Sequence, residues 1–516
     1  MIKKRVFVFL GVALLALAIV PLINLSAWNG PKKEGQEWWS DSVLYNFDFA
    51  SAFLGRVFYP HGISTNPTQV FIGKDDWLYL GEQYEKTVTS RRHQPTALDA
   101  EAAQLIASAT KSWDQWLTLK GVRMFRVMLG PDKNTVYPEF LPDWAQQASR
   151  SSTDALLAND SKGIYVDTRN AMRTAKSRFA ESLYYKTDTH WNSLGAWVAF
   201  RAFEAEIARA EPGLRLLSDH EVRITKVNER QGGDLAKFLR LKETLRDSEV
   251  VVDIVSERPI EIEQYEFDTG RLKKAGGNPQ IHTARQPLLV KSKHALNDKK
   301  VLWLRDSFGT AMAPFMAATF SETLQIHYES ADTASLARLV DTFKPDYVFV
   351  TVVERAARRK RFGSLPPLIF SSEKPKRFTS VSHGLPTETH DLIKTRNRQA
   401  YRVAGADPYV TFSLDQPVRA RDVSQLVLDL NCGEKNEPVK VQVSWHSAGR
   451  EFSEANSVRF TTQPGMTAIN LTPLSSWAQA GAVTDIRVDI DSASACPIVA
   501  ISSLELGKDA GDQSAI

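Results

Sequence analysis

The sequence predicts an α/β domain built on a mostly parallel sheet with flanking helices, followed by an all-β sandwich, behind an N-terminal membrane anchor. Three observations support this architecture. Apolar runs of strand length alternate with segments of helical periodicity between residues 96 and 353. Helical periodicity then gives way to short strand-like runs separated by turns. An apolar run long enough to span a membrane lies near the N-terminus. The chain, at 516 residues, is also long enough for two or three domains.

The N-terminus indicates where the rest of the chain lies. Lys3-Lys4-Arg5 precedes an apolar run from Val6 to Ile23, which at about 18 residues can just span the hydrocarbon core as a helix. Basic residues before such a run stay in the cytoplasm, so the body of the protein should be periplasmic. We expect residues 1–27 to be an uncleaved signal anchor in the inner membrane, because Leu25 fits a cleavage site poorly. Cleavage to a soluble periplasmic protein is the alternative.

Each element of the α/β region follows from a local pattern. Residues 96–119 carry apolar side chains at helical spacing, and Gly121 ends the helix. Alternating strands and helices imply a mostly parallel sheet covered on both faces. In chain order we expect a short helical lead-in at 28–66, a hairpin at 70–80, helices at 96–119, 153–160, 168–182, 193–208, 310–320 and 332–343, and strands at 122–129, 163–166, 250–255, 301–304 and 347–353.

The C-terminal part of the chain has a different pattern. Residues 355–397 contain the basic run Arg358-Arg359-Lys360-Arg361, then Pro366-Pro367, which together indicate a solvated linker. Sandwich strands are expected at 426–430, 439–445, 457–462, 467–471, 484–490 and 498–506. The expected domains are an anchor at 1–27, an α/β domain at 28–355, a linker at 356–397 and a β-sandwich at 398–509.

Charge and cysteine content exclude some classes of function. The formal net charge of +4 is small, and the chain has neither a basic face nor a recognised motif for binding nucleic acid. The two cysteines, Cys432 and Cys496, both lie in the last quarter of the chain, and in an oxidising compartment they are expected to form a disulfide. Two unpaired buried thiols are the alternative. Without clustered histidines the cysteines do not make a zinc site, and we expect neither a metal nor a cofactor.

The segment around Ser307 is the first candidate for chemistry. A buried strand at Val301–Leu304 runs into Arg305-Asp306-Ser307, and a helix starts at Thr310. A sharp turn here would expose the serine hydroxyl at the carboxyl edge of the sheet, with N–H groups of the helix start facing any oxyanion. The alternative is that Asp306 or Ser307 only caps the helix. Taken alone, the segment does not decide between the two.

Asp188 and His190 form a second pattern. In an extended segment, positions i and i+2 lie on the same face, so Asp188 can reach the imidazole. It would then hold His190 in the tautomer whose other nitrogen accepts a serine proton. A single Asp-x-His is frequent by chance. Its combination with a strand-end serine in one exported domain favours a Ser-His-Asp enzyme.

Five short segments together resemble the alginate O-acetyltransferase family of AlgJ and AlgX, whose members have an SGNH-hydrolase-like fold. Each segment is short, but all five occur in the order that the family has. They extend over about residues 65–355 and comprise Ile72–Tyr79 (IGKDDWLY), Gly130–Pro138 (GPDKNTVYP), Lys186–Asn192 (KTDTHWN), Gly233-Asp234-Leu235 and Asp306-Ser307-Phe308.

The resemblance implies a role for each residue of the pattern. Ser307 would be the nucleophile, His190 the general base and acid, and Asp188 the carboxylate that orients the imidazole. Arg305 stands where many SGNH motifs have glycine, which leaves the geometry of the turn open. The resemblance also implies a polysaccharide acceptor, a membrane-bound O-acyltransferase as the partner that donates acetyl groups, and a carbohydrate-binding role for the C-terminal sandwich.

Four further residues are candidates for substrate contact. Lys133 and Tyr137 follow a strand at the edge where open α/β folds bind ligands, with loop packing as the alternative. Trp191 could stack on a sugar or close the core. Arg355, at another strand end, could orient substrate or form a surface ion pair.

The leading hypothesis is an extracytoplasmic O-acetyltransferase that acts on an exopolysaccharide through an acetyl-serine intermediate. One alternative is a polysaccharide acetylesterase or deacetylase that uses the same triad. Another is a non-catalytic polysaccharide-binding scaffold of an export machine. In the sandwich, Trp445 and Trp477 are either sugar-stacking platforms or core aromatics. The sequence does not identify the polymer.

Overall fold

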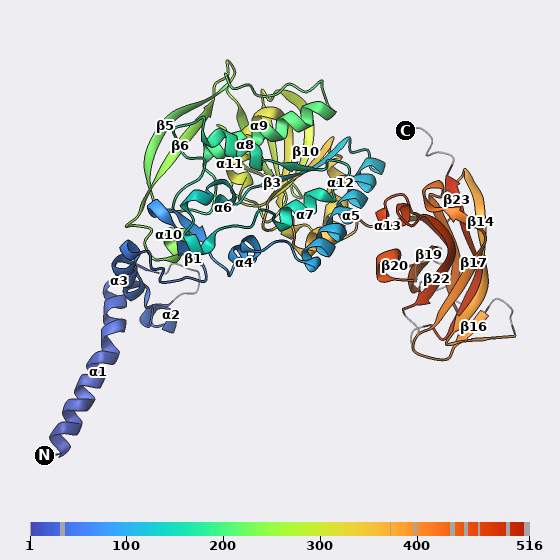
Figure 1. Cartoon of the computed structure of the whole chain (residues 1–516), viewed down its shortest axis with the longest axis horizontal. Helices are drawn as coiled ribbons and strands as arrows, with labels where there is room; N and C mark the ends of the chain where they lie inside the picture. Colours follow the sequence, from blue (N-terminus) through green and yellow to red (C-terminus); the bar gives the residue numbers. More distant parts are fainter. Residues whose placement is uncertain are drawn as a thin grey trace.

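The structure is a computed structural model of the chain, shown in Figure 1. It contains an α/β part, a separate β part and a long helix, α1 (Ile2–Ser26), that projects from the α/β part. The described residues are 2–30, 37–371, 373–396, 400–433, 439–447, 452–462, 465–491 and 496–509.

The α/β part is built on one mixed sheet. In spatial order its strands are β4 (Tyr165–Asp167), β3 (Met124–Gly130), β12 (Tyr347–Val353), β10 (Asn297–Arg305), β11 (Phe320–His327), β9 (Leu288–Lys293), β7 (Glu261–Glu266) and β8 (Leu272–Ala275). Strands β4, β3, β12, β10 and β11 pair in parallel. Strands β9, β7 and β8 continue the sheet in antiparallel pairing. The predicted mostly parallel sheet is therefore parallel in one half only.

Helices and two hairpins surround this sheet. The helices are α4 (Thr87–Arg92), α5 (Ala97–Leu119), α6 (Lys133–Val136), α7 (Ser152–Ala158), α8 (Arg169–Lys176), α9 (Ser193–Ala210), α10 (Asp234–Phe238), α11 (Gly309–Thr319) and α12 (Thr333–Phe343). One antiparallel hairpin pairs β1 (Val70–Ile72) with β2 (Leu78–Leu80), as expected, and the other pairs β5 (Val222–Gln231) with β6 (Arg246–Ile254).

The helices cover both faces of the sheet, because side chains of a strand alternate between its two sides. On one face, Val348 of β12 lines a small cavity together with Trp113 of α5 and Leu336 of α12. On the other face, the next residue, Phe349, packs against Phe203 of α9 with ring centroids 5.0 Å apart. The carboxyl ends of β3, β10 and β12 consequently meet at one edge between the two helical layers.

The β part is one antiparallel sheet folded over a single apolar core. One layer contains β13 (Ile369–Ser371), β21 (Met466–Asn470), β18 (Gln425–Cys432) and β23 (Ile498–Asp509), and the other contains β17 (Tyr409–Arg419), β22 (Ala482–Ile490), β19 (Lys440–Ser447) and β20 (Ser457–Thr461). Strand β14 (Phe378–His390) joins the layers, since it pairs with β23 up to Gly384 and with β17 from Gly384 onward. Two short strands, β15 (Leu392–Lys394) and β16 (Ala400–Val403), extend from β23, and the short helix α13 (Ser475–Ala478) lies before β22.

The linker expected at 356–397 is largely part of this sheet. Strands β13, β14 and β15 all fall inside it and pair with later strands. Arg359 of the basic run pairs with Glu85 and Glu329 of the α/β part, so the run is not fully solvated. We propose that the second domain begins near residue 369. The boundary expected between residues 397 and 398 lies outside the described residues.

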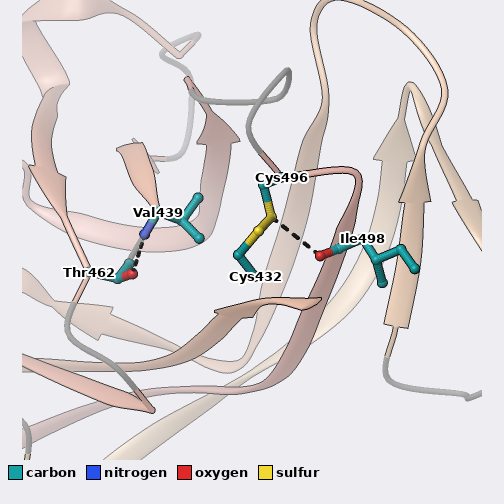
Figure 2. The surroundings of a disulfide bond; sticks show 5 residues. All are labelled: Cys432, Val439, Thr462, Cys496 and Ile498. Atoms are coloured by element: carbon teal, nitrogen blue, oxygen red, sulfur yellow. Dashed lines mark hydrogen bonds between the residues drawn. A yellow bond between two sulfur atoms is a disulfide. The ribbon is translucent and has the colours of Figure 1, made fainter. Parts of the chain in front are cut away.

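A disulfide joins Cys432 to Cys496, the pairing expected from the sequence. Figure 2 shows how the bond connects the end of β18 to the residues just before β23, with Val439 and Thr462 nearby. The two half-cystines are 64 positions apart in the chain. The bond therefore closes a long loop within the β part.

The lead-in to the α/β domain is helical, as expected. Helix α1 contains a segment, Lys4–Ser26, that is long and apolar enough to cross a membrane. Two short helices follow, α2 (Asp41–Leu44) and α3 (Asp48–Phe58). Figure 1 places α2 and α3 where α1 meets the α/β part.

Candidate active site

The three residues with predicted catalytic roles meet at the carboxyl edge of the parallel strands. Ser307 lies in the turn between β10 and α11 and is exposed, whereas its neighbours Asp306 and Phe308 are buried. Asp188 and His190 lie in the loop between α8 and α9. Because β10 is flanked by parallel strands on both sides, its carboxyl end opens onto the edge where α/β folds bind ligands.

A continuous hydrogen-bond chain joins these side chains. His190 Nε2 lies 2.7 Å from Ser307 Oγ, and His190 Nδ1 lies 2.7 Å from Asp188 Oδ1. Asp188 Oδ1 also accepts a hydrogen bond from the backbone N–H of His190 at 3.1 Å. When Nδ1–H donates to the carboxylate, Nε2 is the nitrogen that can accept the serine proton.

A buried lysine holds the loop that carries Asp188 and His190. Lys133 Nζ donates to the backbone carbonyls of Tyr185, Lys186 and Asp188 at 3.0, 2.9 and 2.7 Å. Burial lowers the pKa of Lys133 to about 8. The expectation that Lys133 contacts substrate is wrong in this structure, because all three donor positions of its ammonium are used by the loop.

Asp306 fixes the turn that presents Ser307. Its carboxylate accepts hydrogen bonds from the backbone N–H of Phe308 at 2.9 Å and of Val353 in β12 at 2.8 Å. The turn is thereby tied both to its own helix start and to the neighbouring strand. This explains why an acid precedes the serine: it orders the backbone on either side of the exposed hydroxyl.

Arg305, the residue in place of the usual glycine, points away from the site. Its guanidinium donates to the side chain of Gln325 at 3.0 Å and to the backbone carbonyl of Ile281 at 2.7 Å. The side chain is completely buried. Arg305 in place of glycine therefore does not obstruct the turn. Its side chain ties β10 to the segment before β9 and leaves Ser307 free.

A second carboxylate, Asp234, lies beside the pair. The backbone N–H of Asp234 donates to Asp188 Oδ2 at 3.2 Å, and its own Oδ1 accepts from the backbone N–H of Thr189 at 2.7 Å. Asp234 Oδ2 lies 3.8 Å from His190 Nδ1. Gly233 makes this approach possible, because a Cβ there would lie 2.3 Å from Asp188 Oδ2. The sequence signal was the Gly-Asp-Leu segment, to which no role had been given.

The electrostatics of the loop make His190 a stronger base than a free imidazole. Burial lowers the pKa of His190, but the hydrogen bond and charge of Asp188, with the charge of Asp234, raise it by more. Burial raises the pKa of Asp188, and the contacts with His190 outweigh this and lower it. Burial and the charge of Asp188 raise the pKa of Asp234. Asp188 is therefore the ionised partner of the imidazole at neutral pH.

Two aromatic residues expected near substrate are buried supports. The Tyr137 hydroxyl accepts a hydrogen bond from the backbone N–H of Leu183 at 2.8 Å. Trp191 Nε1 donates to the backbone carbonyl of Phe308 at 2.9 Å, and the two rings pack with centroids 4.8 Å apart. Of the two roles open to Trp191, the structure shows the aromatic wall. Neither ring is exposed enough to stack on a sugar.

Arg355 is the substrate candidate that stays partly exposed. It pairs with Asp132, and its guanidinium carbon lies 6.0 Å from the centre of the Phe308 ring. Behind it, buried Glu354 accepts from the backbone N–H of Asp132 at 2.8 Å and pairs with Arg91. The ion pair expected as an alternative thus exists, but it is mostly buried and lies next to the turn of Ser307.

Within the described ranges, one group of acidic and imidazole side chains has ligand atoms close enough together to hold a metal ion. It consists of Asp188, His190 and Asp234, whose ligand atoms lie within 4.8 Å of one another. In this structure His190 Nδ1 is engaged by Asp188, and Asp234 Oδ1 is engaged by Thr189. Each of these atoms therefore has a protein partner.

Comparison with known proteins adds the family. Residues 70–284 match the SGNH hydrolase-like domain of the acetyltransferase AlgX. This chain has an AlgJ/AlgX-like domain. The predicted resemblance is thereby confirmed. The matched range includes Asp188, His190 and Asp234 and ends before Ser307, so the place of the serine rests on the geometry described above.

The AlgJ/AlgX-like domain has similar relatives in several pseudomonads. A probable alginate O-acetylase AlgJ of Pseudomonas aeruginosa is 24% identical over 297 residues, which are 52% of this chain and 70% of that protein. A probable alginate O-acetylase AlgJ of Pseudomonas syringae pv. tomato is 27% identical over 177 residues, 33% of this chain and 41% of that protein. The solved O-acetyltransferase domain of Pseudomonas putida AlgJ is 18% identical, with a TM-score of 0.37 over 57% of this chain and 93% of that one.

Proposed function

We propose that this chain is an extracytoplasmic O-acetyltransferase that acts on a polysaccharide through an acetyl-serine intermediate on Ser307. The observation that carries the proposal is the hydrogen-bond chain from Ser307 through His190 to Asp188, in which the serine alone is exposed. The names of the relatives, probable alginate O-acetylases, support acetyl transfer as the chemistry.

In the first half-reaction, Ser307 Oγ attacks the carbonyl carbon of an acetyl donor while His190 Nε2 takes the hydroxyl proton. The tetrahedral intermediate collapses, the bond to the donor breaks, and His190 gives the proton to the leaving group. Negative charge on the acyl oxygen develops beside the start of α11, where the positive end of the helix dipole stabilises it. In the part of the chain that the structure describes, the backbone N–H of Ser307 donates to no other backbone group and is available to bind this oxygen.

In the second half-reaction, a sugar hydroxyl gives its proton to His190 and attacks the acetyl-serine. The ester bond to Ser307 breaks, the serine oxygen regains the proton from His190, and the acetylated polymer leaves. Asp188 stays ionised throughout and stabilises the imidazolium that forms in each half-reaction. If water replaced the sugar hydroxyl, the same triad would hydrolyse acetyl esters, so the acceptor alone separates a transferase from an esterase.

The first test is mass spectrometry of the intact protein incubated with p-nitrophenyl acetate. Wild type should gain one acetyl group, and Ser307→Ala should lose the adduct, with turnover of the ester falling by roughly four orders of magnitude. Ser177→Ala is the matched control, because Ser177 is exposed at the end of α8, where its hydroxyl donates to the Thr174 carbonyl. An unchanged adduct in Ser307→Ala would refute the nucleophile.

The acceptor is tested by adding acetyl-free oligosaccharides to the acetylated enzyme. Transfer predicts acetylated sugar and loss of the adduct, whereas an esterase releases acetate at the same rate with or without sugar. Normal polymer acetylation in cells that carry Ser307→Ala would contradict both enzymatic roles and favour a binding scaffold.

We further propose that α1 anchors the enzyme in the inner membrane, where a membrane-bound O-acyltransferase supplies the acetyl groups. The length and composition of Lys4–Ser26 support the anchor. Deleting the gene of such a partner should abolish polymer acetylation in cells, while the purified chain still forms the adduct with p-nitrophenyl acetate. If the chain purified from cells without the partner formed no adduct, the proposal that the partner only supplies acetyl groups would be contradicted.

We also propose that the second domain binds the polymer. Trp445 and Trp477 are buried against each other in the core, so they cannot be platforms for sugar. An accessible site is the row of stacked side chains on the outer face of β17 and β22, where Arg487 lies 4.3 Å from the Tyr409 ring centre and His390 stacks on the same tyrosine. Arg487→Ala should weaken polymer binding by the full chain and leave acetylation of Ser307 unchanged. Equal binding would exclude this face.

A further inference from the structure

The segment between the anchor and the α/β domain exposes an unusual number of large apolar side chains. Isolated exposed apolar residues are common on proteins, but a contiguous group of them marks an interaction surface. Aromatic residues dominate this group, which consists of Trp38, Trp39, Tyr45, Phe47, Phe49, Phe53, Leu54, Val57 and Phe58.

Helix α3 is amphipathic with its apolar side turned outward. Phe49, Phe53 and Val57 follow one another at four-residue spacing and are all exposed. The opposite side of the helix carries Gly55, which packs so closely that a Cβ there would lie 3.0 Å from the backbone carbonyl of Leu239. The small residue fixes which side of α3 faces the domain. The apolar stripe of Phe49, Phe53 and Val57 therefore faces away from the core.

The same segment is attached to the end of the candidate membrane span. Asn24, in the last turn of α1, donates through Nδ2 to the backbone carbonyls of Leu44 and Asn46, each at 2.9 Å. These bonds hold the residues just before α3 at the level where α1 would leave the hydrocarbon core. Figure 1 shows α2 and α3 grouped around this junction. Aromatic side chains concentrate at this level of membrane proteins because their rings are amphipathic.

We propose that residues 37–58 lie on the outer surface of the membrane that α1 spans, with their exposed aromatic side chains in the boundary between lipid headgroups and acyl chains. The inference rests on the proposed anchor. Charge favours lipid burial over attraction to anionic headgroups, since the segment has three acidic residues, Glu37, Asp41 and Asp48, and one basic residue, Arg56. Contact with the membrane should therefore depend little on salt or on the fraction of anionic lipid.

This contact would orient the active site relative to the membrane. Helix α3 is tied to the residues after α10, since Arg240 Nε donates to Asp48 Oδ1 at 2.5 Å. Helix α10 starts at Asp234, whose backbone N–H donates to Asp188. A short packed path thus connects the lipid-facing stripe to the loop of His190. The enzyme would be held by two attachments, α1 through the bilayer and α3 on its surface, and its domain could not rotate freely about the anchor.

The test uses the full chain in vesicles of phosphatidylethanolamine and phosphatidylglycerol. Phe53→Cys introduces one free thiol, because the two native cysteines are joined in a disulfide. The thiol is labelled with an environment-sensitive fluorophore and exposed to two quenchers, iodide in the water and nitroxide-labelled lipid in the membrane. Leu98→Cys, in the first turn of α5, is the control; Leu98 is 76% exposed and Phe53 66%.

The proposal predicts opposite quenching at the two sites. The label at position 53 should lose iodide quenching and gain lipid quenching, while the label at 98 shows the reverse, and Val57→Cys, one turn further on, should behave like Phe53→Cys. The pattern should persist when salt is raised or phosphatidylglycerol is omitted. Equal iodide quenching at 53 and 98 would overturn the proposal. Protection from iodide without lipid quenching would also overturn it and indicate a protein as the occupant.

The anchor is checked separately by flotation of the same vesicles. If the protein floats with the vesicles but iodide quenches the label at position 53, the surface contact is refuted and the anchor is retained. Protein that does not float refutes the anchor and, with it, this inference. Acetylation of Ser307 by p-nitrophenyl acetate is measured on every variant and should be unchanged, so that neither result is confused with a failure of the catalytic proposal.

Discussion

The basicity of His190 depends on two carboxylates rather than one. Asp188 bonds Nδ1 directly, and Asp234 Oδ2 lies 3.8 Å from the same nitrogen. Both negative charges stabilise the imidazolium and raise the pKa of His190. A general base must be neutral to accept a proton, so activity should fall as the pH drops through this raised pKa.

Asp234→Asn removes one charge but keeps an oxygen that accepts from the Thr189 N–H. The pKa of His190 should fall, and the acid limb of the pH profile of ester turnover should move to lower pH. The measurement is kcat/KM for p-nitrophenyl acetate against pH. Asp188→Asn, in contrast, should lower activity at every pH, because it removes the group that orients the imidazole. An unmoved acid limb in Asp234→Asn would mean that Asp234 has only a structural role.

Lys133 gives a second prediction at this scale. Lys133→Met keeps the aliphatic volume but leaves three backbone carbonyls without their donor, which should lower the free energy of unfolding of the α/β domain by about 3 kcal/mol. Lys186→Met is the control, since Lys186 is in the same loop but exposed. Thermal unfolding followed by circular dichroism compares the two. Similar melting temperatures would show that the lysine bonds contribute little.

Single residues were predictable where a pattern fixes geometry. Asp188 and His190 are two positions apart, so their contact is local, and Ser307 follows a strand of marked apolar character. Lys133 was misassigned because a cation at a strand end looks the same whether it binds a ligand or backbone carbonyls. Trp191 could not be decided for a similar reason, since burial depends on residues distant in the chain.

At the scale of elements, the predictable strands were those with a buried face. Four of the five parallel strands of the first sheet were anticipated. Strand β11 was missed because polar residues interrupt its apolar ones, and β7 to β9 were missed because β8 is exposed along its whole length and β7 has one buried residue. Strand β14 was taken for linker because it is rich in Ser and Thr and contains Gly384 and Pro386. Its register shifts near that proline, which is how a strand accommodates it.

The start of α10 provides a prediction for an element. Gly233→Ala puts a Cβ within 2.3 Å of the Asp188 carboxylate, so that α10 or the acid must move. Ester turnover should fall about a hundredfold, because the imidazole loses its orientation. Gly213→Ala is the control, as a Cβ there meets nothing within 4 Å. The two variants are compared by kcat and by melting temperature. If the two variants lost the same stability and had the same kcat, a specific effect of the Gly233→Ala Cβ on the Asp188 carboxylate would be contradicted.

At the scale of the whole molecule, the disulfide should stabilise the β part and leave the activity of the α/β part unaffected. Both cysteines lie in the β part, and the bond closes a loop of 64 positions, which corresponds to about 4 kcal/mol of stabilisation. A variant with Cys432→Ala and Cys496→Ala should therefore unfold its β part at lower temperature. The α/β part contains no cysteine and should still acetylate Ser307. A single unchanged unfolding transition would show that the two parts unfold together.

The hydrogen bond between His190 and Ser307 joins residues 117 positions apart, and this distance has a consequence for the timing of activity. Strand β10, which carries the serine turn, pairs on both sides with strands that follow it in the chain, β11 and β12. Such long-range contacts form late, because the chain must close large loops first. Until they form, Ser307 is an ordinary weakly nucleophilic hydroxyl. On the proposed mechanism, a chain that has not completed folding would therefore be inactive, and acetyl labelling of Ser307 would measure the completion of folding as directly as catalysis.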